Sequence, residues 1–217
     1  MFLPIFGAFL VLAISGFGCN FKAQPFVKHS ASESEPLASF KADSLPYKSA
    51  DLVIAGTAMP VVFEADRKPG EVVFFLRSKH GEVLEHEAYR FDVGQFSLWR
   101  AGGELYEPVI PLLKDPVSAG ASWEWSGQMF PAVDGEPVRN SEAVRKATAK
   151  ISLASDTLNI LGGSKPAMRV NVLLSIDSGS NVRAQRTLSF WFMKDRGLVK
   201  RDFAFASTRG PSNRVEP

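Results

Sequence analysis

Cys19 is the residue whose position points most directly to chemistry. It is the only cysteine in the chain, so no internal disulfide can form. An uncharged apolar run over 1–17 precedes it, and Gly18 stands directly before it, as a small residue does before the processed cysteine of a bacterial lipoprotein signal. We therefore predict a signal peptide over 1–18 and lipidation of Cys19. Ordinary signal cleavage and a retained membrane anchor are the alternatives.

Tryptophans form the second group of chemically suggestive residues. Trp123 and Trp125 share one face of an extended segment, and Trp191 lies in an aromatic-rich run near the C-terminus. Indole rings on a sheet can stack against a sugar or line a site for an apolar ligand. Trp123, Trp125 and Trp191 are therefore the candidate ligand-facing residues, although the same residue types on strands also fill cores.

The residues needed for catalysis do not form a recognisable set. His80 and His86 are too far apart along an extended chain to share one metal ion, and His29 lies in a polar segment. The chain has neither a nucleophile elbow nor a phosphate-binding loop. Paired acids such as Glu85 and Glu87 could serve glycoside chemistry, but nothing fixes their separation. We expect no catalytic, cofactor-binding or metal-binding residues, no enzyme activity and no nucleic-acid partner.

A β-hairpin is predicted where the aromatic residues are densest, over 186–205. Two apolar runs flank the turn 194–197, and Phe190 and Phe192 point to one face while Trp191 points to the other. A strand that is apolar on both faces is covered on both sides, either by protein or by a ligand. The basic residues around the turn suggest either a solvated turn or a contact with lipid headgroups or a partner; they are Lys194, Arg196, Lys200 and Arg201.

Short apolar runs separated by turn residues continue through most of the chain. Turn signals recur every 8 to 12 residues or so, which is typical of an all-β protein. We predict a mainly antiparallel, strongly curved sheet or half-open barrel with little helix. The predicted organisation is a flexible tether over 19–49, one β domain over 50–207 and a disordered tail over 208–217.

The charges are distributed unequally along the chain. Residues 51–137 carry seven basic and fourteen acidic side chains, whereas 138–217 carry fourteen basic and six acidic ones. The simplest explanation is that the two segments interleave in the fold and that their side chains pair across the sheet. The alternative is a basic face for anionic lipid headgroups or an acidic partner.

Several of these segments together resemble a family of exported bacterial proteins of unknown function. The resemblance covers about 105–205 and rests on the following series: Pro111-Leu112-Leu113, then Gly120-x-x-Trp123-x-Trp125-x-Gly127, then Gly162-Gly163 and Ala167-x-Arg169-Val170, and finally Phe190-Trp191-Phe192 followed by Gly197-Leu198-Val199-Lys200. It implies an exported protein built on an antiparallel sheet and carries no catalytic residues. The architecture is also distantly similar to that of the outer-membrane lipoprotein carrier and receptor group, whose half-barrel holds acyl chains.

We therefore expect a non-catalytic lipoprotein of the bacterial cell envelope, held at a membrane through Cys19. The leading hypothesis is that its curved sheet binds an apolar ligand or another envelope component. A structural or protein-interaction module with a filled core is the alternative, and a carbohydrate-binding or carbohydrate-active protein is a weaker one. A carrier should show an apolar cavity, whereas an interaction module should show a filled core and an exposed apolar patch.

Overall fold

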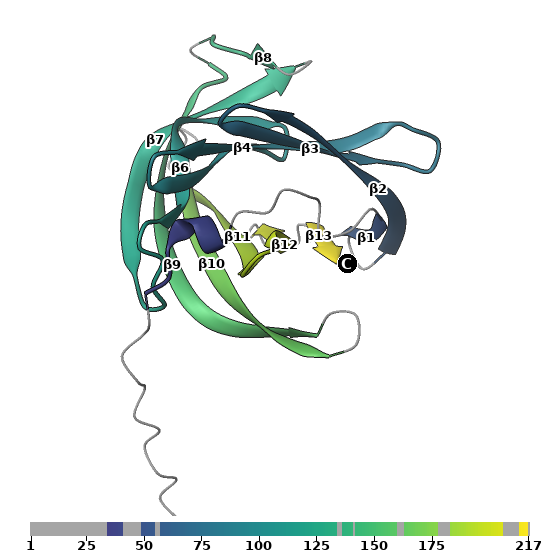
Figure 1. Cartoon of the computed structure of the whole chain (residues 1–217). Coiled ribbons are helices and arrows are strands. Elements are labelled where there is room, and N and C mark those ends of the chain that lie inside the picture. Colours follow the sequence, from purple (N-terminus) through teal and green to yellow (C-terminus); the bar gives the residue numbers. More distant parts are fainter. Residues whose placement is uncertain are drawn as a thin grey trace, which may run out of the picture. The chain divides into compact units, whose positions relative to one another are not determined.

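The protein is described by a computed structural model that covers residues 34–40, 49–54, 57–133, 136–140, 142–159, 163–177, 183–205 and 213–216. All of these residues belong to the compact unit Ala31–Pro217. Within them, thirteen strands form one antiparallel sheet that curls strongly (Figure 1). The prediction of an all-β, curved antiparallel sheet with little helix is confirmed. The predicted signal peptide and Cys19 lie outside the described residues.

The elements follow one another as a meander with short turns. The bounds are η1 (Leu37–Phe40), β1 (Ser49–Ile54), β2 (Thr57–Lys68), β3 (Glu71–Arg77), β4 (Val83–Asp92), β5 (Gln95–Ala101), β6 (Glu104–Lys114), β7 (Ser122–Val133), β8 (Glu136–Pro137), β9 (Arg145–Asn159), β10 (Ser164–Asp177), β11 (Arg183–Met193), β12 (Gly197–Phe205) and β13 (Asn213–Glu216). The 3-10 turn η1 is the one helical element of the described residues. No helix in this part of the chain is long and apolar enough to cross a membrane.

Alternating side chains explain the longest strand pairing. β9 and β10 pair from Ser164 opposite Asn159 to Asp177 opposite Lys146. Ile151 and Val172 face each other in this register and are fully buried, whereas Lys150, next along β9, is exposed. One face of the two strands is therefore apolar and packs inward, and the other face is polar.

The predicted hairpin over 186–205 is present as β11 and β12. Asp195 and Gly197 adopt left-handed backbone conformations in its turn. Phe190 and Phe192 are buried in the main core, and Trp191 packs on the opposite face of the sheet. Protein side chains therefore contribute to the covering of both faces of β11.

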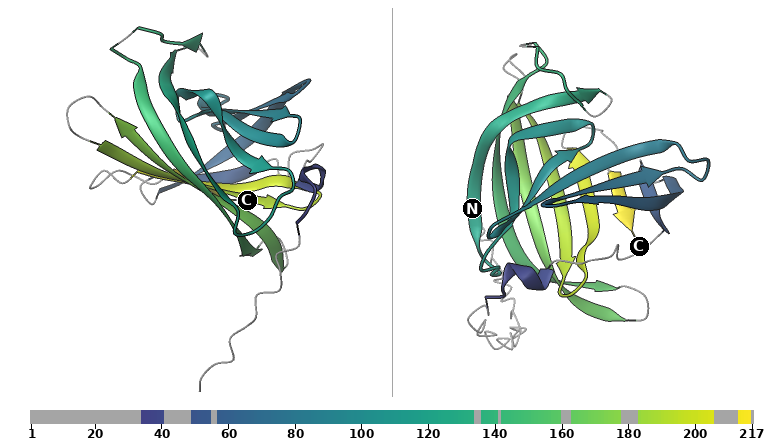
Figure 2. Two further views of the ribbon diagram at one scale, coloured as in Figure 1. Left: turned by 90° about the vertical axis from the view of Figure 1, so that its left-hand side faces the viewer. Right: turned by 45° about the horizontal axis from the view of Figure 1, so that its top comes forward.

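The sheet curls until strands from its two ends meet. We call β2–β6 the first wall and β7 with β9–β12 the second wall; Figures 1 and 2 show the walls facing each other. β6 pairs with β7 only where Glu104–Glu107 meets Gln128–Pro131. Beyond this point β6 is paired with β5 alone; its prolines, which cannot donate to a backbone ladder, lie in this part of the strand. We call the unpaired stretch between β6 and β7 the seam.

Side chains from both walls fill the space between them. Each fully buried large apolar side chain contributes about 1.5–3 kcal/mol to folding. Buried side chains of this core include Tyr89, Phe96, Leu98, Tyr106, Ile110, Leu112, Leu113, Met129, Ile151, Val170, Val172, Leu188, Phe190, Phe192 and Phe203.

The segment Glu35–Phe40, which we call the strap, lies across one end of the sheet. Glu35 exchanges two backbone hydrogen bonds with Val117, and Asp195 N–H donates to the carbonyl of Ser39 at 2.7 Å. Leu37 and Phe40 are buried in the main core. The strap, purple in Figure 2, lies beside the β11–β12 turn. These residues fall within 19–49, the range of the predicted tether, so packing against the sheet begins before residue 50.

Candidate functional site

An ion cluster lies in the interior between the two walls. It consists of Glu85, Glu87 and Tyr89, which alternate along β4, and Arg201 of β12. Arg201 Nη2 donates to Glu85 Oε2 at 2.6 Å, and its Nε contacts Glu87. The Tyr89 hydroxyl donates to Glu87 Oε2 at 2.7 Å. The side chains of Arg201 and Glu87 are each only 3% exposed, so two carboxylates share one guanidinium away from water.

This geometry changes the acidity of the cluster. Burial raises the pKa of Glu87 to about 7; Arg201 opposes this rise and Glu85 adds to it. Burial and the neighbouring Glu87 raise the pKa of the Tyr89 hydroxyl well above its usual value, so the phenol stays neutral. Burial therefore raises the pKa of both a carboxylic acid and a phenol in this cluster.

A second ion pair crosses the same interior. Arg186 of β11 hydrogen-bonds to Glu104 of β6, and their side chains are 21% and 17% exposed. Tyr106, two residues after Glu104, is fully buried, and burial raises its pKa. The polar interior is thus a small network that links β4 and β6 of the first wall to β11 and β12 of the second.

The acidic and basic segments do form ion pairs, as predicted, but their strands lie in separate blocks of the sheet and do not interleave as expected. Glu85, Glu87 and Glu104 come from the acidic segment, and their partners Arg186 and Arg201 come from the basic one. On the surface, Arg139 Nη2 also pairs with Glu107 at 2.6 Å. The interior pairs join strands that face each other across the core and are not neighbours in the sheet.

Trp123 and Trp125 bridge the seam. The indole Nε1 of Trp125 donates to the carbonyl of Pro108 at 3.0 Å, and that of Trp123 donates to the carbonyl of Pro111 at 3.0 Å. Both rings pack against the main core. Two side-chain hydrogen bonds thus connect strands that have no backbone pairing here.

The position of the Trp125 ring at the seam leaves no room for a side chain at residue 127, so this residue has to be glycine. A Cβ at this position would lie 2.4 Å from the Trp125 ring and 2.5 Å from the carbonyl oxygen of Glu107. The Trp125 ring therefore covers the backbone of Gly127, two residues further along the strand. The spacing Trp125-x-Gly127 follows from this packing.

Trp191 lies on the other face of the sheet, away from Trp123 and Trp125. Its Nε1 donates to Asp156 Oδ2 at 2.8 Å, and the Lys200 ammonium lies 5.1 Å from the ring centre. The ring packs against a small cluster made of Leu158, Ala167, Met193 and Val199. The structure therefore brings two of the three candidate ligand-facing residues together and separates the third from them.

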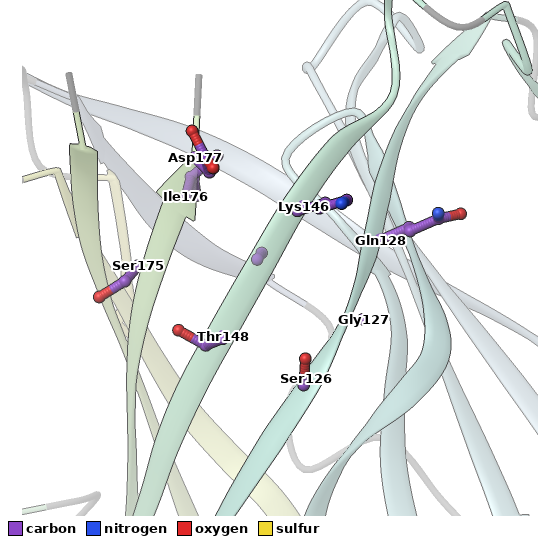
Figure 3. Close-up of a pocket in the computed structure, with 9 residues that line it drawn as sticks. Ser126, Gly127, Gln128, Lys146, Thr148, Ser175, Ile176 and Asp177 are labelled. Carbon is purple, nitrogen blue, oxygen red and sulfur yellow. The ribbon is translucent and has the colours of Figure 1, made fainter. Parts of the chain in front are cut away.

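A shallow hollow of about 600 Å³ lies over β7, β9 and β10 (Figure 3). Its polar lining residues alternate with core residues along these strands, so they lie on the face opposite the core; they are Ser126, Gln128, Lys146, Thr148, Ser175 and Asp177. The hollow differs from an apolar ligand cavity in both its position and its polar lining.

The buried position of Arg201 could not be predicted from the basic residues that surround it in the sequence. Arg201 belongs with Lys194, Arg196 and Lys200 to the basic residues around the hairpin turn, but in the structure it is buried against Glu85 and Glu87. Its position on the same face as Phe203, two residues later, was the available signal. Lys194 pairs with Glu35 of the strap at 3.0 Å, and Arg196 is exposed.

The histidines show no metal site in the described part of the chain. His80 is exposed, and His86 contacts the Phe75 ring with centroids 5.2 Å apart. Burial, with a contribution from Arg100, lowers the pKa of His86. No group of three or more potential ligand residues is found among the described residues.

Comparisons with known proteins give two structural likenesses. No protein-family model and no curated protein matches the chain significantly. It is similar to a candidate exported protein with a YmcC-like fold from Bacteroides fragilis, at 12% identity and a TM-score of 0.47, over 86% of this chain and 98% of that one. It is also similar to a candidate lipoprotein from Parabacteroides distasonis, at 10% identity and a TM-score of 0.45, over 85% of this chain and 99% of that one. The function is therefore inferred from the geometry of the chain itself.

Proposed function

We propose that this chain is a non-catalytic module of the bacterial cell envelope, anchored through Cys19, that acts by binding another envelope protein. The observation that carries the proposal is the filled interior. The inward-facing aromatic side chains of both walls are buried against one another, and Leu37 and Phe40 of the strap pack into the same core. A carrier for an apolar ligand would instead line its concave face with accessible apolar groups.

An exposed apolar patch on the first wall supports a protein partner. Val62 and Val83 lie opposite Arg77 on either side of β3, so these three side chains share one face of the sheet. Val62 is 42% exposed and Val83 is 48% exposed. Arg77 lies over the Phe75 ring, 5.6 Å from its centre. This combination of apolar groups with an arginine and an aromatic ring is typical of the central part of protein interfaces.

Native mass spectrometry of the full chain, purified from a bacterial host, tests the filled core. We expect the mass of the protein with its covalent lipid and no further apolar adduct. The variant Cys19→Ala should lack the lipid mass. A stoichiometric apolar molecule that organic solvent extracts from both proteins would overturn the filled-core proposal and favour a carrier.

Photo-crosslinking in cells tests the patch. A crosslinking amino acid at Val83 should give a discrete adduct with another envelope protein. Leu173, on the outer face of β10, is the matched control because it has similar exposure, 45% against 48% for Val83. The same adducts from both positions, or none from Val83, would contradict a partner at this patch.

A further inference from the structure

The strap is held by a loop and a turn that are far apart in the sequence. Glu35 N–H donates to the carbonyl of Val117 at 2.8 Å, and Val117 N–H donates to the carbonyl of Glu35 at 2.7 Å. Leu37 N–H donates to Asp115 Oδ1 at 2.7 Å. At the other end of the strap, Asp195 in the β11–β12 turn donates a further backbone hydrogen bond. We call the site formed by Asp115, Val117 and the β11–β12 turn the strap groove.

Two apolar side chains fix the strap in this groove. Leu37 is 4% exposed and Phe40 is 8% exposed. They are three residues apart on the 3-10 turn η1, a spacing that places both side chains on one side of the turn. Both pack into the main core, whereas Ala38 between them is exposed. The groove therefore fits an apolar pair at a fixed spacing.

The charge of the groove favours an acidic ligand. Lys194 of the β11–β12 turn pairs with Glu35 at 3.0 Å, and their side chains are 58% and 34% exposed. An ion pair at this exposure adds little to affinity, but it favours one orientation and one charge of the bound segment. The segment that fits the groove thus has an acidic residue, then leucine two positions later and phenylalanine five positions later. Glu35, Leu37 and Phe40 have this spacing.

Every copy of the chain carries both the strap groove and the segment that fits it. The bridge between Glu35 and Val117 lies outside the strands of the sheet. A strap from a second copy would make the same contacts as the chain's own strap, so exchange between copies loses none of them. The balance between the two straps then depends on local concentration. Anchoring of many copies in one membrane raises that concentration.

We propose that the strap of one copy docks in the strap groove of a second copy, and that this exchange forms a dimer at the membrane. The inference rests on the anchoring through Cys19 proposed above, and it adds a second surface to the patch around Val83. The strap is joined to β1 through residues 41–48, a length of chain that spans at most about 28 Å. The two grooves of the dimer therefore lie close together, and each holds the strap of the other chain, as in a two-fold symmetric contact.

Disulfide trapping in cells tests the exchange. Two differently tagged full-length chains are produced in one bacterial host, one with Glu35→Cys and the other with Val117→Cys. Residues that exchange two backbone hydrogen bonds across a pair have Cα atoms about 5.5 Å apart, which a disulfide can span. Because each chain has only one introduced cysteine, a bond between positions 35 and 117 requires exchange. Oxidation of the membranes should give this bond in a dimer that carries both tags.

Three controls separate exchange from chance collision. Leu173→Cys, on the outer face of β10, should give no discrete dimer when it replaces Val117→Cys. Adding Leu37→Asp and Phe40→Asp to the Glu35→Cys chain should abolish the bond, because two charges would have to be buried in the groove. The double variant Glu35→Cys, Val117→Cys should form the bond within one chain and so show that both substitutions are tolerated.

An intrachain bond in the double variant, without a mixed dimer from the two single variants, would overturn the exchange. If Val117→Cys does not fold, a photo-crosslinking amino acid at the exposed Lys194 takes its place and should react with the strap of the other tagged copy. A crosslink from Lys194 to a different envelope protein, and none to the other copy, would overturn a second copy as the occupant. A disulfide that involves Cys19 would contradict the anchoring, and mass spectrometry distinguishes it from the bond between positions 35 and 117, so the two proposals can fail separately.

Discussion

Two glycines near the start of β7 are needed for different physical reasons. Gly120 has a φ of +86°, a left-handed conformation that favours glycine, and a Cβ there would meet no other atom. Gly127 has no such backbone requirement, but the Trp125 ring and the carbonyl of Glu107 occupy the position of its Cβ. The sequence shows both glycines, yet only the seam geometry explains Gly127.

Alanine substitutions should separate the two causes. Gly120→Ala should lower the free energy of unfolding by about 1 kcal/mol, the cost of a left-handed conformation. Gly127→Ala should lower it by about 3 kcal/mol, because backbone and a packed ring would have to move. Urea denaturation measures both values. Equal losses for the two variants would contradict the close packing of Trp125 over Gly127.

The strap is the element that the sequence did not reveal. Leu37 and Phe40 are two apolar residues in a polar segment that is rich in serine and alanine, and two such residues do not create a periodic pattern. The strands were predictable because apolar runs and turn residues recur along the chain; the hairpin predicted over 186–205, for example, is present as β11 and β12. Docking of the strap depends on Val117 and Asp195, which are far apart in the sequence and lie close together only in the folded chain.

The strap should detach without unfolding the sheet. In the double variant Leu37→Asp, Phe40→Asp, two charges would have to be buried, so the strap should leave the core while the strand pairing persists. Hydrogen exchange should then show loss of protection at the amide of Asp195, which donates to Ser39, but not in β9 and β10. Ala38→Asp, at an exposed position of the strap, should keep that protection. Loss of protection throughout the sheet would show instead that the strap is indispensable for folding.

At the scale of the whole molecule, ion pairs across the interior connect the two walls of the curved sheet. The uneven distribution of charge along the chain was enough to predict that its acidic and basic segments pair. It was not enough to predict which residues meet, because Arg201 reaches Glu85 and Glu87 only when the sheet curls and brings β12 opposite β4. Contacts across a curved interior depend on the twist of many strands, which no local pattern contains.

Removing the Arg201 guanidinium should therefore lower the free energy of unfolding more than removing one carboxylate of the cluster. Arg201→Met would remove the guanidinium that contacts Glu85 and Glu87, and we expect the free energy of unfolding at pH 8 to fall by about 3–5 kcal/mol. Adding Glu85→Gln and Glu87→Gln to this variant should restore a large part of the loss, because no charge would then remain to be buried. Urea denaturation of the single and triple variants measures the difference. A triple variant no more stable than Arg201→Met would contradict charge burial as the cause.

The attachments of the strap also determine how the domain would respond to mechanical force. A pull on the chain from before residue 35 would act first on the backbone pair between Glu35 and Val117 and on the ion pair between Glu35 and Lys194. These contacts lie on the loop after β6 and on the turn between β11 and β12, so the load would be divided between the two walls. Tension would therefore detach the strap before it acted on any strand of the sheet. The curved sheet would keep its shape while the strap is pulled away from it.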